Sequence, residues 1–441
     1  MPESPDHFSV DSAAERSVAA LASRSALSRI GIRFTFLYLL LYCYFGLPII
    51  PFVGDWLATP IDWAWRLICP WTAVHVFHLS GPVTRYHPTG SGDTTLEYIR
   101  VFCYAILAAL GALLWSILDR KESRSEMLYP WIRLILRFYL AAVLLSYGFG
   151  KVFPLQFPAP DFTRLSETFG EASPMGLLWA FMGASQAYEM FSGLAEVIPG
   201  LLLLFRRTTT VGALIAVAVL SNIVALNFCF DVPVKLFSSH LLLMALFLLV
   251  ADRTQLWNFF MLHQLAQLHA VRIPRWERRA LRTSALALQI LVIGGTLYSA
   301  ISTNYGYYKQ SGAVANQNRL LSGVWELELA TNSASRPADS EGEWQRLYMP
   351  QAGRLGTRTA GGKLLRFISD ADEKAHTLHL KGWRNDHVAE LSYSLRDKDH
   401  LVLTGTIDRK HVDLRYHRLD PGQFLLTTRG FHWISEDPYN L

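Results

Sequence analysis

Apolar runs of membrane-spanning length alternate with short polar segments over residues 30–301. A helix needs about 20 apolar residues to cross the hydrocarbon core of a bilayer. Seven runs reach or approach this length and are predicted to be transmembrane helices: 30–52, 96–118, 131–153, 177–205, 211–228, 232–250 and 285–301. The first part of the chain is therefore expected to be an α-helical integral membrane bundle.

The pattern changes to short alternating segments after residue 304. Alternation of apolar and polar positions with a period of two is typical of half-buried strands. Eight such runs are present: 323–330, 344–349, 364–368, 377–382, 389–395, 401–407, 412–417 and 423–428. They predict an antiparallel meander, which eight strands can close into a small barrel without free edges.

These patterns divide the chain into six parts. They are a polar tail (1–29), a hairpin of two helices with an aromatic loop (30–127), helices three to six (128–252), a basic interfacial segment (253–284), the seventh helix (285–303) and the β-rich domain (304–441).

The distribution of charge sets an orientation. Only 17% of residues are charged, and the net charge of +5 is carried by short basic clusters between apolar runs. One stripe of cations with interleaved aromatics is missing from the sequence, so nucleic-acid binding is not expected. Cationic side chains resist translocation, and the clusters occupy alternate connections. This predicts a cytoplasmic N-terminus and a β domain on the opposite, external side of the membrane.

Polar residues inside the apolar runs are the candidates for function, because a carboxylate that faces lipid is very costly. In the fourth run, Glu189, Gly193, Glu196 and Gly200 share one helical face at spacings of four, three and four. The glycines permit close helix approach. From their depths, two ion pairs are expected, one between Lys151 and Glu189 and one between Arg137 and Glu196.

A polar pocket reached from the outside is predicted from residues of the third to sixth runs. Its expected members are Lys151, Gln186, Glu189, Asn222, Asn227, Asp231, Lys235 and His240. One interpretation is that the pocket binds a quinone head group or another small molecule, with Glu189 or His240 exchanging a proton. The other is that these side chains satisfy one another and fix helix register. No metal site is expected: His75 and His78 would share a helical face but lack a third ligand nearby.

Three segments resemble the DoxX-like membrane proteins: SYGFGKVFPLQF, GLAEVIPGLLLLFRRTTTVGAL and NFCFDVPVKLFSSHLLLMALFLL. The resemblance covers about residues 131–252 and implies a four-helix core. It also implies a protein of the bacterial inner membrane, whose external β domain would then be periplasmic. The positions that match the family pattern are Gly150, Lys151, Glu196, Gly200, Arg206 and Arg207. Because the family is named after a subunit of a thiosulfate:quinone oxidoreductase, the resemblance implies a redox role. The additional helices and the C-terminal domain depart from a minimal DoxX protein.

The start of the β-rich domain carries a second resemblance. Gly323-Val-Trp325 is similar to the G-x-W of lipocalin-type barrels. The likeness implies that Trp325 closes one barrel end and that an arginine on a late segment stacks across it, for which Arg429 is expected.

Two functions therefore stay open. The first is an envelope redox component that binds a quinone or a small sulfur compound and works with a redox protein, as a quinone-linked oxidoreductase subunit if it is an enzyme. The second is a non-enzymatic scaffold or sensor whose external β domain binds a partner or lipid.

Overall fold

The computed structural model describes residues 26–44, 53–81, 90–119, 128–250, 252–264, 279–315, 321–330, 344–349, 353–372, 374–383, 386–420, 422 and 424–428. These residues form two compact units. The helical unit contains residues 1–149 and 193–302, and the barrel unit contains residues 150–192 and 303–441.

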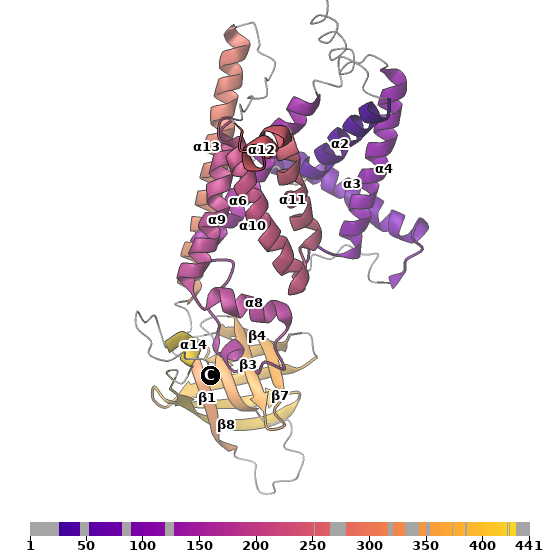
Figure 1. Cartoon of the computed structure of the whole chain (residues 1–441). Helices are drawn as coiled ribbons and strands as arrows, with labels where there is room; N and C mark the ends of the chain where they lie inside the picture. The colour runs from indigo at the N-terminus through magenta and orange to yellow at the C-terminus, as the bar shows by residue number, and fades with distance from the viewer. Residues whose placement is uncertain are drawn as a thin grey trace, which may run out of the picture. The chain divides into compact units, whose positions relative to one another are not determined.

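Most of the described residues before the barrel are helical (Figure 1). They are α2 (Ala26–Tyr44), α3 (Val53–His75), α4 (Thr95–Leu118), α6 (Leu128–Val152), α7 (Phe162–Leu165), α8 (Pro174–Gly183), α9 (Gln186–Leu204), α10 (Thr209–Cys229), α11 (Lys235–Val250), α12 (Arg253–Phe260) and α13 (Arg279–Ala315). Within the described ranges, four of them, α4, α6, α9 and α10, are long and apolar enough to cross a membrane. Helices α11 and α12 qualify only together, and they meet at a bend of 80°.

Each of the seven predicted runs overlaps a helix, although the fourth run is wrong in its extent. It joins two helices, because α8 ends at Gly183 and α9 begins at Gln186. A Cβ on Gly183 would lie 2.2 Å from the carbonyl oxygen of Pro158, so α8 ends in close contact with the preceding loop. The Ser185 hydroxyl then accepts a hydrogen bond from the backbone N–H of Tyr188, as a helix N-cap does.

Two further expectations need correction or stay open. His75 and His78 do not share a helical face, because α3 ends at His75 and His78 has a positive φ of 54°. The end of the first run, 45–52, and residues 265–278 of the basic segment lie outside the described residues.

Small residues bring α6 and α9 together inside the helical unit. A Cβ on Gly148 would lie 2.7 Å from Val197 and 2.9 Å from the Gly193 carbonyl oxygen. A Cβ on Gly200 would lie 3.0 Å from the Leu145 side chain. The close approach predicted at Gly193 and Gly200 is therefore present, and side chains larger than hydrogen would force these helices apart.

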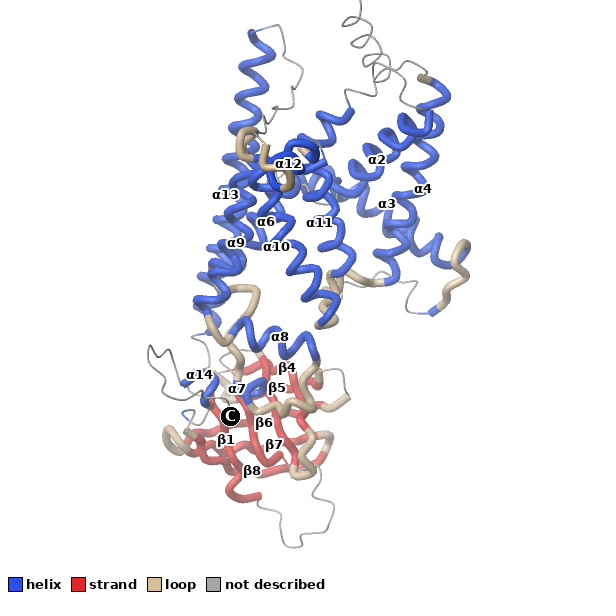
Figure 2. Tube along the Cα trace, in the orientation of Figure 1, coloured by secondary structure: helices blue, strands red, loops and turns tan. Residues whose placement is uncertain are grey.

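The barrel unit contains a closed antiparallel barrel in which each strand pairs with the next and β8 pairs with β1 (Figure 2). The strands are β1 (Gly323–Ala330), β2 (Trp344–Met349), β3 (Arg354–Thr359), β4 (Leu364–Asp372), β5 (Thr377–Gly382), β6 (Val388–Leu395), β7 (His400–Ile407) and β8 (Lys410–Leu419). The eight-stranded barrel predicted from the alternation is confirmed.

One predicted strand is wrong and one strand was missed. Residues 425–428 form a helical turn, α14 (Leu425–Thr428), because β8 already pairs with β1 and leaves no edge for another strand. Strand β3 was missed because its sequence, RLGTRT, lacks apolar alternation. Its inward positions are instead Leu355, Thr357 and Thr359, all buried.

The barrel interior is filled by apolar side chains around Trp325, which is fully buried. The indole Nε1–H of Trp325 donates a hydrogen bond to the Leu321 carbonyl oxygen at 2.9 Å. The guanidinium that lies over its ring, 4.6 Å from the centroid, belongs to Arg418 on β8. Arg429, which the sequence suggested for this place, lies outside the described residues.

Candidate functional site

The residues predicted to form one pocket belong to two units. Lys151, Gln186 and Glu189 are in the barrel unit, and Asn222, Asn227, Asp231, Lys235 and His240 are in the helical unit. Each group therefore has to be understood from its own contacts.

His240 on α11 lies in an aromatic cluster of the helical unit. Its Nδ1 is 2.7 Å from the Leu236 carbonyl oxygen, which can only accept, so Nδ1 carries a proton. Its Nε2 is 2.7 Å from the hydroxyl of Tyr38 on α2. The imidazole also stacks on the ring of Tyr42, with 4.0 Å between centroids and 8° between planes. In the neutral imidazole, Nε2 is thus an acceptor that faces a phenol.

The cluster continues from Tyr42 toward two further helices. Tyr42 contacts the ring of Tyr104 on α4 edge-on, and Tyr104 in turn packs against Trp65 on α3 with 4.8 Å between centroids. Tyr42, Tyr104 and Trp65 are all buried. Four helices therefore contribute rings to one continuous aromatic cluster around the only ring nitrogen acceptor among these residues.

Lys235 and Asp231 form the turn that starts α11. The Nζ of Lys235 is 2.7 Å from an Asp231 oxygen. Asp93, from the segment before α4, accepts hydrogen bonds from the backbone N–H groups of Lys235 and Leu236 at 2.8 and 2.9 Å. It therefore caps the N-terminus of α11 from a distant part of the chain, and its negative charge interacts favourably with the positive end of the helix dipole.

The two asparagines behave differently. Asn227 is buried, and its amide donates a hydrogen bond to the Ser238 hydroxyl at 2.9 Å, which joins α10 to α11. Asn222 is exposed on α10. Of the two, Asn227 is the one whose side chain makes a hydrogen bond inside the helical unit.

Glu189 is fully buried at the start of α9 in the barrel unit. Its Oε1 accepts a hydrogen bond from the backbone N–H of Phe157 at 2.9 Å. Lys151 attracts this carboxylate only at longer range, because no cationic nitrogen of the described residues lies within ion-pair distance of Glu189. The predicted Lys151–Glu189 ion pair is thus replaced by a backbone hydrogen bond, and Gln186 is exposed.

The second predicted ion pair is not formed either. Arg137 is buried, and its guanidinium lies 4.7 Å from the ring centroid of Phe138. The described residues place no carboxylate, including that of Glu196, within ion-pair distance of Arg137. The paired arginine of α6 is instead Arg133, which lies 3.0 Å from Asp252. The Thr210 hydroxyl donates to the same Asp252 oxygen at 2.6 Å.

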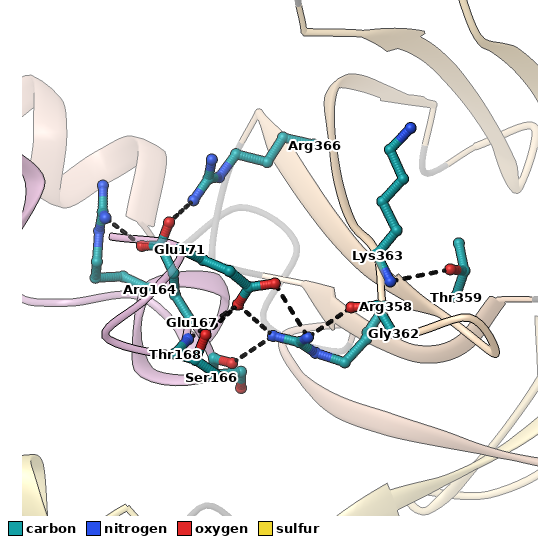
Figure 3. A network of polar contacts seen from close by, with 10 residues as sticks. All are labelled: Arg164, Ser166, Glu167, Thr168, Glu171, Arg358, Thr359, Gly362, Lys363 and Arg366. Carbon is teal, nitrogen blue, oxygen red and sulfur yellow. Dashed lines mark hydrogen bonds and ion pairs between the residues drawn. The ribbon is translucent and has the colours of Figure 1, made fainter. Parts of the chain in front are cut away.

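A polar network that the sequence did not suggest holds residues 156–173, called the strap below, against the barrel (Figure 3). Its centre is Glu167, whose side chain is only 4% exposed. One Glu167 oxygen pairs with Arg164 of the strap, and the other lies 2.6 Å from the guanidinium of Arg366 on β4.

Glu171 makes the second attachment of the strap. Its two oxygens lie 3.3 and 2.9 Å from the two terminal nitrogens of Arg358 on β3, and the Ser166 carbonyl oxygen accepts from the same guanidinium at 2.9 Å. The hydrogen bonds from Arg358, with help from the Thr168 backbone N–H, lower the pKa of Glu171 to about 2. Glu171 is therefore ionised at neutral pH.

Direct packing completes the attachment. Thr163 of α7 is buried against Gly356 of β3, where a Cβ would lie 2.5 Å from the threonine hydroxyl. The spacing of Asp161, Arg164 and Glu167 was a visible local signal, since residues three apart meet on a helical turn. The partner of Glu167 on β4, Arg366, is 199 residues away, and no local pattern indicates it.

Helices of membrane-spanning length and a closed eight-stranded barrel are compatible with a membrane protein that carries a β domain. No protein-family model matches the chain, and no solved structure matches it. The chain is 36% identical over 126 residues to the uncharacterized protein YwoB of Bacillus subtilis (strain 168), and this alignment covers 28% of the chain and 79% of YwoB. The chain therefore belongs to the family of YwoB, whose name assigns no activity.

Proposed function

We propose that the chain is an integral protein of the bacterial inner membrane with seven transmembrane helices. The N-terminus faces the cytoplasm, and the barrel unit faces the periplasm. Two observations support this proposal. Each of the seven apolar runs overlaps a helix, which supports the number of spans. Clusters of lysine and arginine occupy alternate connections between the runs, which supports the orientation.

Within this protein, we propose that the helical unit binds a quinone head group, or a small sulfur compound of similar size, as part of an envelope redox system. The resemblance to DoxX-like proteins favours this function. The observation that carries it is the contact between Tyr38 and His240, which places a phenol donor and an imidazole acceptor 2.7 Å apart within a cluster of aromatic rings.

The chemistry of this pair suits a quinone. In the structure, the Tyr38 hydroxyl and Nε2 of His240 satisfy each other. A quinone carbonyl that takes the place of Nε2 would accept the Tyr38 hydrogen bond, and the released Nε2 would be the base that a quinol needs when it is oxidised. The ring of Tyr42 offers a flat apolar surface beside both groups. Two electrons would pass to or from a redox protein partner, while His240 exchanges one of the two protons and solvent exchanges the other.

The test is to measure quinone bound to the full-length protein after purification in mild detergent. We expect about one quinone per chain in the wild type, because a preorganised donor and acceptor favour a single bound head group. Tyr38→Phe removes one hydroxyl and keeps the ring, so it should lower the bound fraction severalfold, whereas Tyr129→Phe is the matched control in the same unit. Glu189→Gln tests whether that carboxylate belongs to the same site.

Absence of quinone from all four proteins, together with no binding of added ubiquinone-1, would exclude this function. Equal occupancy in wild type and Tyr38→Phe would place the quinone elsewhere.

The second candidate is a non-enzymatic scaffold or sensor whose barrel unit binds a partner or lipid. It is favoured by the way in which the polar groups of the helical unit satisfy one another, as in the Asn227–Ser238 hydrogen bond and the capping of α11 by Asp93. Under this function, Tyr38→Phe should change the stability of the protein, and neither the wild type nor the variant should carry bound quinone.

A further inference from the structure

A pocket of about 290 Å³ lies between the strap, helix α8 and strands β3 and β4 of the barrel unit. This volume is at the lower end of the range for small-molecule sites. The strap forms one wall, and the two glutamate attachments and the contact between Thr163 and Gly356 hold that wall in place. The pocket is therefore formed before any ligand arrives.

Three arginines line the pocket: Arg164 from the strap, Arg354 from β3 and Arg366 from β4. Glu167 pairs with Arg164 and Arg366. Arg354 has no carboxylate within ion-pair distance among the residues that the structure describes. The charges of the lining and of Glu167 together leave an excess of positive charge.

The acidic residue of the lining does not cancel this excess. Asp161 uses one carboxylate oxygen to accept the backbone N–H of Arg164 at 2.8 Å and so caps α7. Arg366 has further donors, because its one contact with Glu167 uses a single terminal nitrogen. Arg354 and Arg366 can thus both donate to an anion inside the pocket.

Aromatic and apolar side chains form the remaining walls. Trp179 of α8 and Phe367 of β4 line the pocket with Trp383, which follows β5. The backbone N–H of Trp383 donates to the Arg366 carbonyl oxygen at 2.7 Å, which fixes the indole beside β4. The Arg354 guanidinium lies 5.5 Å from the Trp383 ring centroid, so the available cation stands beside a flat apolar surface.

We infer that this pocket binds a small organic acid, a carboxylate or sulfonate carried on a flat apolar body. The acid group would pair with Arg354 and Arg366, and the apolar body would lie against Trp179 and Trp383. An inorganic anion would use the charge but leave the aromatic walls without a partner. This inference does not depend on quinone binding by the helical unit, so either can fail alone.

The experiment uses the full chain in nanodiscs of zwitterionic lipid and 4-(trifluoromethyl)benzoate as the probe, observed by fluorine NMR. We expect saturable line broadening with the wild type and none with the uncharged amide of the same probe. Arg354→Gln should weaken binding by about tenfold or more, because it removes a charge-assisted contact. Arg396→Gln is the matched control, since Arg396 is exposed outside the pocket, and it should bind as the wild type does.

A second variant separates the aromatic contribution from the charge. Trp383→Leu keeps Arg354 and Arg366 and should weaken binding severalfold, because the aromatic ring of the probe can no longer stack on the indole. The inference is overturned if the probe does not bind saturably, or if Arg354→Gln binds as the wild type does. It is also overturned if sulfate displaces the probe at equal concentration, since the site would then recognise charge alone.

Discussion

The helical unit and the barrel unit place the carboxylates of their least exposed ion pairs differently. In the helical unit, Asp93, Asp119 and Asp252 stand at helix ends, and each pairs with one cation of another helix. In the barrel unit, the buried Glu167 lies between two guanidinium groups. The barrel itself has an apolar interior, so its charges lie outside and attach the strap.

The comparison shows where each unit depends most on a single residue. Asp93 also accepts two backbone N–H groups, so losing it removes a cap but leaves an apolar helix packed as before. Removing a carboxylate that lies between two arginines is more costly, because it leaves two positive charges close together. Substitutions should therefore cost more in the strap than at the helix ends.

The largest effect is expected for Glu167→Gln. The amide cannot balance Arg164 and Arg366, and we expect the strap to lose about 2 kcal/mol of attachment, less than for a fully buried pair because both arginines are partly exposed. Hydrogen exchange of residues 157–173, measured by mass spectrometry on the intact chain, should rise accordingly, while exchange in the barrel strands stays constant.

Glu326→Gln is the matched control for this change, because Glu326 also pairs with an arginine, Arg346, but on the exposed barrel surface. It should alter exchange little. If the two variants raise hydrogen exchange equally, the position of Glu167 between two cations does not make its loss more costly, and the contrast between the units is wrong.

A smaller effect is expected for Asp93→Ala in the helical unit. The change removes the acceptor for the N–H groups of Lys235 and Leu236, and loss of such a cap costs about 1–2 kcal/mol. Amide exchange over the first turn of α11 should increase, and exchange in the middle of α11 should not. Asp62→Asn is the control, because Asp62 pairs with Arg66 on the same helix and both side chains are partly exposed. Uniform exchange along α11 in Asp93→Ala would argue against capping.

The sequence predicts the elements of both units better than it predicts their sites. An apolar run or a period of two is a local property, so the helices of membrane length and seven of the eight strands were visible. Strand β3 was not, because Gly356 is covered by Thr163 of the strap while Leu355 and Thr357 are buried on the inner face, and a segment covered on both faces need not alternate.

The partners of the polar residues could not be predicted, because they depend on contacts between distant segments. Helix depth alone pairs Arg137 with Glu196, yet Arg133 pairs with Asp252. Likewise, Asp93 stands just before α4 and looks like a cap for that helix, but it caps α11, while Thr94 caps α4. Residue type and position were informative, whereas the identity of the partner required the fold.

The smallest effect, and the sharpest in pH, concerns the second attachment of the strap. The pKa of Glu171 falls from its usual 4.5 to about 2 because Arg358 and the Thr168 backbone N–H hydrogen-bond the ionised form. A folded-state pKa below the unfolded one stabilises the strap fully above about pH 5, and this contribution is lost as the pH falls from 4.5 toward 2. For a partly exposed pair, this contribution to the attachment of the strap is about 1 kcal/mol.

In wild type, therefore, exchange of residues 166–173, corrected for its intrinsic pH dependence, should stay constant from pH 7 to 5 and rise only at lower pH. Glu171→Gln should show the raised exchange already at pH 7, with no further rise in the acid range beyond that of the barrel strands. A wild-type rise centred near pH 6 would instead assign the attachment to another group and remove Glu171 from the comparison.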